Sequence, residues 1–115
     1  MPDDGMDLLQ GTLEVLVLRT LAGEPRHGYG IMQWLRSRTD GVLDVQDAAL
    51  YQALRRMERK GWVEADWAVT ENNRRARYYA LTAQGRAQLG SRMAAWQRYA
   101  EAMFKVLTPI AEEGI

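Results

Sequence analysis

Apolar residues recur every three or four positions along several stretches of the chain, which is the period of an α-helix with one buried face. This pattern predicts helices over residues 6–22, 27–38, 47–60 and 82–107. Between the last two, aromatic and β-branched runs at 62–67 and 77–81 flank the polar segment TENNRR and predict a β-hairpin. Residues 41–45 could add a short strand beside it. The expected fold class is mainly α with a small β-hairpin.

The predicted helix over residues 47–60 has an apolar back and a basic front. Asp47 suits its N-cap and Gly61 its end. The apolar stripe is Leu50, Leu54 and Met57. The opposite face carries Tyr51, Gln52, Arg55, Arg56 and Arg59. Such a helix fits the DNA major groove, where Arg and Gln can each make two hydrogen bonds to one base edge.

The hairpin places more positive charge beside this helix. Arg74 and Arg75 lie at its tip and Arg77 lies just inside its second strand. Of Tyr78 and Tyr79, one should face the core near Trp62 or Trp67 and the other the solvent or DNA. Helix, hairpin and basic tip together predict a winged helix-turn-helix, in which the hairpin is the wing and Tyr29 can reach a phosphate.

The last predicted helix carries an apolar seam, with Thr82 as its N-cap and Pro109 beyond its end. The seam repeats with a 4-3-4-3-4 spacing, at Leu89, Met93, Trp96, Ala100, Met103 and Leu107. This spacing is typical of a helix that packs lengthwise on another. With no other long helix expected to receive it, we expect a partner subunit to do so, which predicts a homodimer. The chain then divides into a DNA-binding domain (1–81) and a dimerisation segment (82–115).

The first predicted helix is apolar on two sides. Leu9, Leu13, Leu16 and Thr20 lie on one side, and Leu8, Val15, Leu18 and Ala22 on the other. Both sides could pack within one domain core. Alternatively, the side with Leu9 packs on a dimer mate.

Composition excludes several classes of function. The 15 basic and 15 acidic residues give a net charge of zero, so DNA binding depends on where the charge lies. The absence of cysteine excludes disulfides, thiolate metal sites and a cysteine nucleophile. His27 is the only histidine and has no companion for a metal site or a catalytic set, so we expect a structural role near a helix start, no cofactor and no enzyme activity. With no signal peptide and no membrane span, the expected location is cytoplasmic.

Several motifs in register resemble the PadR-like transcriptional regulators, from about residue 8 to 89. They are GTLE at 11–14, PRHGYGI at 25–31, LY at 50–51, LRRME at 54–58 with Gly61, RYY at 77–79, and LT at 81–82 with Gly85. The resemblance implies a transcriptional repressor. A homodimer would place two recognition helices about one helical turn apart, which matches a palindromic or near-palindromic operator. The resemblance also implies an effector pore at the dimer interface for flat hydrophobic compounds, to which Trp96 and Val15 correspond.

Two segments depart from the family pattern. The hydroxyl residue that usually precedes the Leu-Tyr pair is replaced in Ala48-Ala49, and the wing has Asn72-Asn73 and Ala76 instead of glycine and proline. The bases read and the path of the wing therefore stay open. Trp96 could equally be a packed interface residue without a ligand. The alternative function is a winged-helix module that binds protein.

Overall fold

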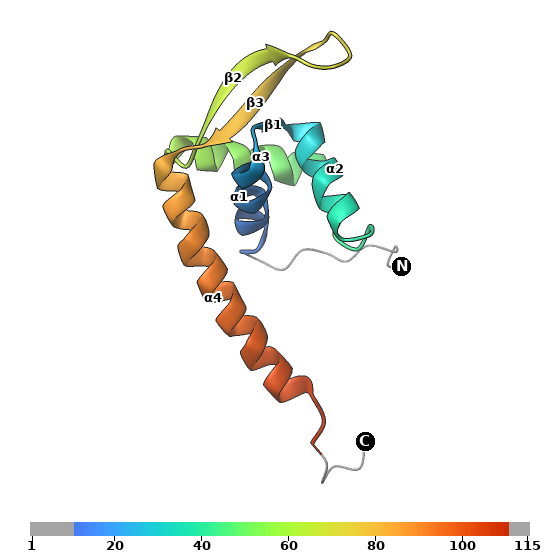
Figure 1. The fold of residues 1–115 in the computed structure, drawn as a ribbon, viewed down its shortest axis with the longest axis vertical. Helices are drawn as coiled ribbons and strands as arrows, with labels where there is room; N and C mark the ends of the chain where they lie inside the picture. Colours follow the sequence, from blue (N-terminus) through green and yellow to red (C-terminus); the bar gives the residue numbers. More distant parts are fainter. Residues whose placement is uncertain (1–10, 111–115) are drawn as a thin grey trace.

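In the computed structural model, which describes residues 11–110, four helices and a three-stranded sheet form the chain (Figure 1). In chain order they are α1 (Leu13–Gly23), β1 (Arg26–His27), α2 (Gly28–Arg38), α3 (Asp47–Arg59), β2 (Val63–Val69), β3 (Arg75–Leu81) and α4 (Ala83–Leu107). The mainly α architecture with a β-hairpin wing is as predicted.

The sheet has the order β1-β3-β2, with all neighbours antiparallel. Its hairpin is longer than predicted and runs from the pair Val63↔Leu81 to the pair Val69↔Arg75. The third strand is β1, which pairs Arg26 with Tyr79 and His27 with Tyr78 and was not predicted. Two residues are too short a run to show a strand period.

The strand considered over residues 41–45 does not form. Asp40 and Gly41 take positive φ angles of 53° and 83°, which turn the chain at the end of α2. The backbone N–H of Gly41 donates to the Arg36 carbonyl at 2.8 Å, and that of Val42 donates to the Thr39 carbonyl at 3.0 Å. These bonds close a helix C-terminus, and the loop that follows holds only an isolated β-bridge residue at Leu43.

One predicted helix start and one predicted N-cap were also wrong. Helix α1 begins at Leu13, because Gly11 has φ 84° and cannot continue a helix; Leu8 and Leu9 lie outside the described residues. Gln46, not Asp47, is the N-cap of α3, and its side chain makes no capping bond. Asp47 is in the first turn, where its negative charge still suits the helix dipole.

His27 has the structural role expected of it. Its Nδ1 accepts a hydrogen bond from the Gly30 backbone N–H at 3.0 Å and so caps α2. The ring packs edge-on against Tyr78, with 5.1 Å between centroids. One histidine therefore connects the start of α2 to the wing.

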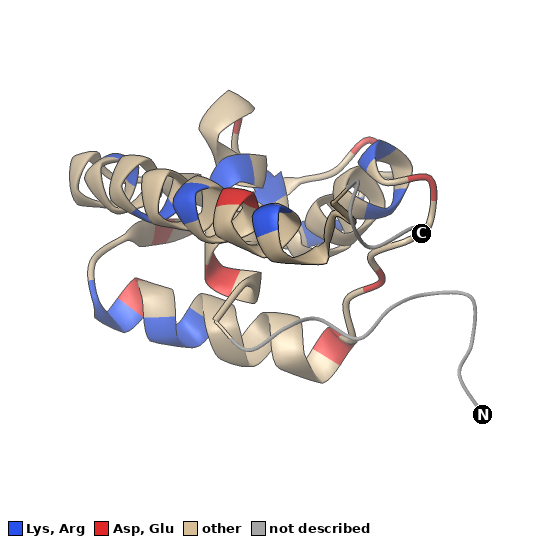
Figure 2. Ribbon diagram, turned by 90° about the horizontal axis from the view of Figure 1, so that it is seen from below, with Lys and Arg blue, Asp and Glu red and all other residues tan. Residues whose placement is uncertain are grey.

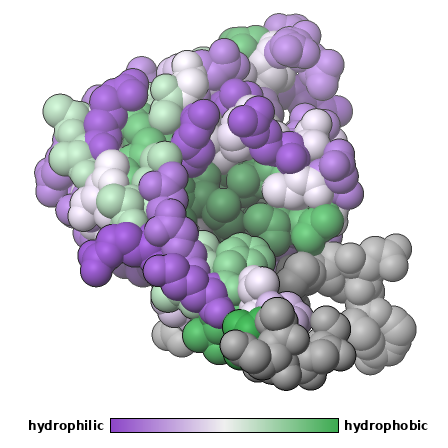
Figure 3. Space-filling view, turned by 60° about the horizontal axis from the view of Figure 1, so that its bottom comes forward, coloured by the Kyte–Doolittle hydropathy of each residue, from purple (hydrophilic) through white to green (hydrophobic). Residues whose placement is uncertain are grey.

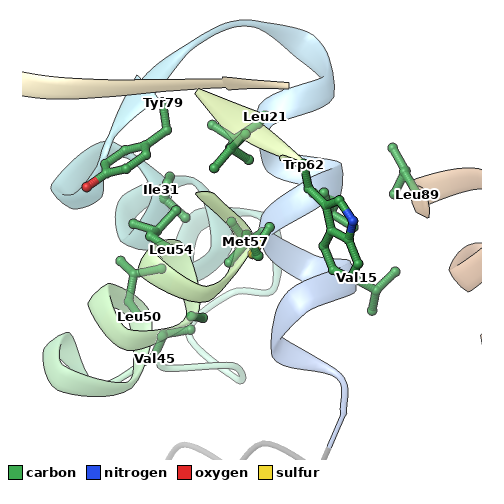
Figure 4. Close-up of a cluster of buried hydrophobic side chains, with 14 of the residues drawn as sticks. Val15, Leu21, Ile31, Val45, Leu50, Leu54, Met57, Trp62, Tyr79 and Leu89 are labelled. Atoms are coloured by element: carbon green, nitrogen blue, oxygen red, sulfur yellow. The ribbon is translucent and has the colours of Figure 1, made fainter. Parts of the chain in front are cut away.

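The core lies where α1, α2, α3 and the base of the wing meet (Figure 4). Its fully buried side chains include Leu18, Leu21, Ile31, Leu50, Leu54 and Met57. Tyr79 of β3 covers one end of the core, beside Ile31 and Leu54. Across the hairpin it pairs with Ala65, and not with Trp62 or Trp67. Trp62 covers the other end near Val15. Helix α3 is thus held by its apolar stripe, with its polar face outward.

The first half of the α4 seam packs within the chain itself. Leu89 is buried in the domain core, and Met93 and Trp96 pack against it beside α1. The expectation that no helix of the chain could receive the seam was therefore wrong for its first half. Beyond Ala100 the helix extends away from the domain (Figure 1), and Met103 and Leu107 are exposed.

A compact junction joins α3, the wing and α4. Gly61, with φ 80°, ends α3, and the Thr82 hydroxyl contacts the carbonyls of Gly61 and Trp62 at 2.6 and 3.1 Å. The same hydroxyl accepts from the Gly85 backbone N–H at 3.0 Å and caps α4 as predicted. A Cβ at position 85 would overlap the Trp62 carbonyl oxygen. The junction therefore requires glycine there.

We expect Gly85→Ala to lower the free energy of unfolding by about 1–3 kcal/mol, since overpacking against backbone cannot be relieved by a rotamer change. Gly90→Ala is the matched control on the same helix, because a Cβ at position 90 meets nothing within 4 Å. That variant should be about 0.5–1 kcal/mol more stable, since alanine replaces a helical glycine. Urea unfolding followed by circular dichroism measures both. Equal effects of the two variants would show that the α4 start is not packed as described.

Candidate nucleic-acid interface

The exposed face of α3 is polar and basic. Gln52, Arg55 and Arg59 point away from the buried stripe, and all three are exposed. In the view from below, the blue cationic segments of α3 gather in its second half, away from the acidic residue at its start (Figure 2). Among residues 11–110, neither Arg55 nor Arg59 forms an ion pair. Both guanidinium groups are therefore available to an anionic ligand.

Two of the predicted DNA-binding arginines are engaged within the chain. Arg77 donates to both carboxylate oxygens of Glu58, at 3.2 and 2.9 Å, and so ties the wing to α3. Desolvation lowers the Arg77 pKa, but Glu58 and Tyr79 together outweigh it, so the net shift of the pKa is upward. Arg56 lies on the flank of α3 toward α1, with its Nε 3.4 Å from Glu14 Oε2. The predicted trio on α3 is thus not one continuous stripe.

Tyr51 lies on the opposite flank of α3, against the start of α2. A Cβ at Gly28 would overlap its hydroxyl and ring, so the close contact needs glycine at that position. Burial raises the pKa of Tyr51, and the nearby Tyr79 and Asp47 raise it further. The phenol therefore keeps its proton at neutral pH and can act as a hydrogen-bond donor beside the exposed face of α3.

An open groove of about 1250 Å³ lies between α2 and the wing. Tyr29 and Tyr51 contribute to one wall, and Arg74, Arg75 and Trp67 contribute to the other. Trp67 is 56% exposed, and the Arg75 guanidinium lies 5.0 Å from its ring centroid. Aromatic rings next to unpaired guanidinium groups suit contact with sugars and phosphates.

Several residues of this groove were missed from the sequence. They are Arg26, Trp34, Arg36 and Trp67. Trp34 has three guanidinium groups around it, those of Arg19, Arg26 and Arg38, at 5.4 to 5.9 Å from the ring centroid. The alternation of residues along the first wing strand could have pointed to Trp67. The arginines around Trp34 could not have been found in this way, because they come from α1, β1 and α2, which only the fold brings together.

A second, more apolar cavity of about 500 Å³ lies between α1 and α4. It is lined by Gly11, Thr12, Val15, Arg92, Ala95, Trp96 and Tyr99. Val15 and Trp96 therefore share one cavity, and the Trp96 and Tyr99 rings meet edge-on with centroids 5.5 Å apart. On the face seen in Figure 3, hydrophobic surface gathers in a hollow with hydrophilic borders.

Neither a metal site nor a membrane span occurs in the part of the chain that the structure describes. No group of three or more His, Cys, Asp or Glu side chains there could hold a metal ion, and no helix there is long and apolar enough to cross a membrane.

Comparisons with known proteins agree with this geometry. Residues 17–91 match the model of the transcriptional regulator PadR-like family. An uncharacterized protein of Lysinibacillus sphaericus is 30% identical over 95 residues, which cover 83% of this chain and 87% of that protein. A PadR family transcription regulator of Clostridium difficile has a similar structure, with a TM-score of 0.73, 25% identity and coverage of 84% and 99% of the two chains. A transcriptional regulator of Clostridium thermocellum shares the fold at a TM-score of 0.78, with 23% identity and coverage of 86% and 93%.

We expect Arg77→Ala to lower the midpoint of denaturant unfolding more than a neutral surface substitution does, because it removes both bonds to Glu58. Arg74→Ala is the control, since Arg74 is exposed and forms no ion pair among residues 11–110. Its effect should stay within about 0.5 kcal/mol. Denaturant unfolding measures both. If Arg77→Ala proved as mild as Arg74→Ala, Arg77 would not be anchored to α3 in solution.

Proposed function

Because this chain belongs to the PadR-like family of transcriptional regulators, we propose that it is a homodimeric repressor that binds a palindromic operator. In this proposal residues 1–81 bind DNA and residues 82–115 dimerise. The DNA contacts come from Tyr29, Tyr51, Gln52, Arg55, Arg56, Arg59, Arg74, Arg75 and Arg77. Helix α3 enters the major groove, and the wing follows the adjacent backbone.

The observation that carries the proposal is the set of unpaired arginines on α3 and the wing. Arg55 and Arg59 on α3, and Arg74 and Arg75 on the wing, are exposed and form no ion pair among residues 11–110. The chain is neutral overall, so this local excess is the feature that would attract phosphates. Gln52 among them offers both a donor and an acceptor for an adenine edge.

The far half of α4 supports dimerisation. Phe104, Val106 and Leu107 are 67%, 81% and 64% exposed, and Tyr99 and Met103 add to the same end of the helix. Apolar side chains grouped in this way are typical of a surface that another subunit covers. Of the predicted dimer residues, Ala100, Met103 and Leu107 lie here. Leu89, Met93 and Trp96 pack on this chain's own α1, so a partner would contact them only at their outer edges.

Two occupants fit the cavity between α1 and α4. Side chains of the partner subunit could fill it, with Trp96 as a packed interface residue. Alternatively, a flat hydrophobic effector could stack on Trp96 and Tyr99 near Val15, as the family resemblance implies. Release of DNA by such a compound would then follow from a change in how the two subunits sit against each other.

We expect Arg55→Ala with Arg59→Ala to weaken binding of the DNA upstream of the gene by about thirtyfold or more, since each arginine can contribute about 1–3 kcal/mol at a base. The plot of log affinity against log salt should also become shallower. Arg98→Ala with Lys105→Ala removes the same charge from the outer face of α4 and should change affinity much less. Fluorescence anisotropy at two salt concentrations, with random DNA as competitor, measures all three proteins.

Two outcomes would contradict this assignment. Unchanged affinity and salt dependence in the α3 variant would remove α3 from the interface. Equal, weak binding of the native protein to upstream and random DNA would favour the alternative, a winged-helix module that binds protein.

For the dimer, we expect Met103→Glu with Leu107→Glu to produce monomers at micromolar concentration, because two carboxylates would have to be buried without partners. Ala94→Glu adds an acidic residue to the exposed side of the same helix and should leave the oligomeric state unchanged. Sedimentation velocity over a concentration series distinguishes them. A native protein that sediments as a monomer throughout would overturn the homodimer.

A further inference from the structure

Glu14 occupies a position that the DNA-binding proposal alone does not explain. It lies in the first turn of α1, and its side chain is only 15% exposed. Its Oε2 is 3.4 Å from Nε of Arg56 on α3, and its Oε1 is 3.5 Å from an η-nitrogen of Arg92 on α4. One carboxylate therefore bridges the proposed recognition helix and the helix that carries the proposed dimer surface.

The Arg92 end of this bridge reaches the cavity between α1 and α4. Arg92 lines that cavity together with Trp96 and Tyr99. Its guanidinium also lies 4.7 Å from the ring centroid of Trp62, and its Nε donates to Gln88 Oε1 at 3.3 Å. Anything that fills or reshapes the cavity must therefore pack against Arg92 or move it.

The Arg56 end reaches the surface assigned to DNA. The Arg56 side chain is 45% exposed, so it can pair either with Glu14 or with a phosphate at the edge of the α3 face. In the present arrangement each arginine uses one carboxylate oxygen. If Arg92 leaves, both oxygens become available to the fork of Arg56, and a two-bond arginine–carboxylate pair is stronger than a single contact.

We propose that Glu14 is a positioning residue that couples the α1–α4 cavity to the DNA face through Arg92 and Arg56. Displacing Arg92 tightens Glu14 on Arg56, withdraws Arg56 from phosphate and weakens DNA binding. The sign suits a repressor that releases DNA when the cavity is filled. This inference rests on the proposed DNA-binding function, and it names a path by which that function is regulated.

The test is a double-mutant cycle between Arg56→Gln and Arg92→Gln, read as the dissociation constant of a mixed-sequence DNA duplex at low salt. A phosphate contact does not depend on base sequence, so no operator is needed. Arg92→Gln should weaken binding about two- to fivefold more when Arg56 is present than when it is Gln, in the range of exposed ion pairs. In the Glu14→Gln background this ratio should fall to one.

The matched control replaces Arg56→Gln by Arg59→Gln, a second arginine of the same helix that does not contact Glu14. The cycle with Arg92→Gln should then be additive. A ratio of one for Arg56 in the native background would overturn the proposal. So would an unchanged ratio in the Glu14→Gln background.

A second readout does not need DNA and separates the two proposals. The Nε–Hε resonance of Arg56, assigned from its loss in Arg56→Gln, should shift in Arg92→Gln but not when Glu14→Gln is already present. If no duplex binds even at low salt, the DNA-binding function fails, and this resonance alone decides the coupling. If the Arg56 resonance did not shift in Arg92→Gln while Glu14 is present, the coupling would be overturned.

Discussion

The geometry of the molecule depends on the few polar contacts around Thr82. Its hydroxyl is hydrogen-bonded to the carbonyls of Gly61 and Trp62 and to the N–H of Gly85, so it links the turn between α3 and β2 to the start of α4. The Trp62 N–H meanwhile donates to the Met57 carbonyl at 2.9 Å and closes α3. Because these groups are partly buried, leaving any of them unpaired would be costly. Helix α3 and the wing therefore keep one relative orientation, which a DNA-binding surface built from both requires.

Ion pairs within the chain then divide the arginines of that surface into two groups. Arg77 pairs with Glu58 and Arg56 pairs with Glu14, so these two arginines mainly hold the wing and α1 in position against α3. Arg55 and Arg59 are exposed and form no ion pair in the part of the chain that the structure describes. A net charge of zero is thus compatible with a phosphate-binding face, because intramolecular pairs neutralise the arginines that position the elements and leave others free. It also keeps attraction to arbitrary polyanions weak, which favours selective binding.

The periodicity of the chain predicted the four helices and the hairpin, but it did not predict strand β1 or the contacts between elements. The stripe Leu50, Leu54 and Met57 predicted the buried side of α3, and all three are fully buried, because burial follows directly from helical spacing. Strand β1 and the loop at residues 41–45 were misjudged, since both depend on long-range pairing or on single residues with positive φ. The partners of Arg56 and Arg77 could not be predicted either. Glu14 is 42 positions from Arg56, and no local pattern marks such a pair.

The α4 seam shows how one apolar pattern can serve two contacts. Its 4-3-4-3-4 spacing is uniform, yet Leu89 is buried in the domain while Leu107 is exposed. In this helix of 25 residues the first half packs on the domain, and the second half is exposed to solvent within residues 11–110. Helix propensity alone gives marginal stability in water, so burial against another apolar surface would stabilise the second half considerably. A partner on that end of α4 would lie next to the cavity at Trp96, because Tyr99 is exposed there and also lines the cavity, as does Arg92. Such a partner would then affect the proposed DNA-binding face, because α1 lies between α4 and α3.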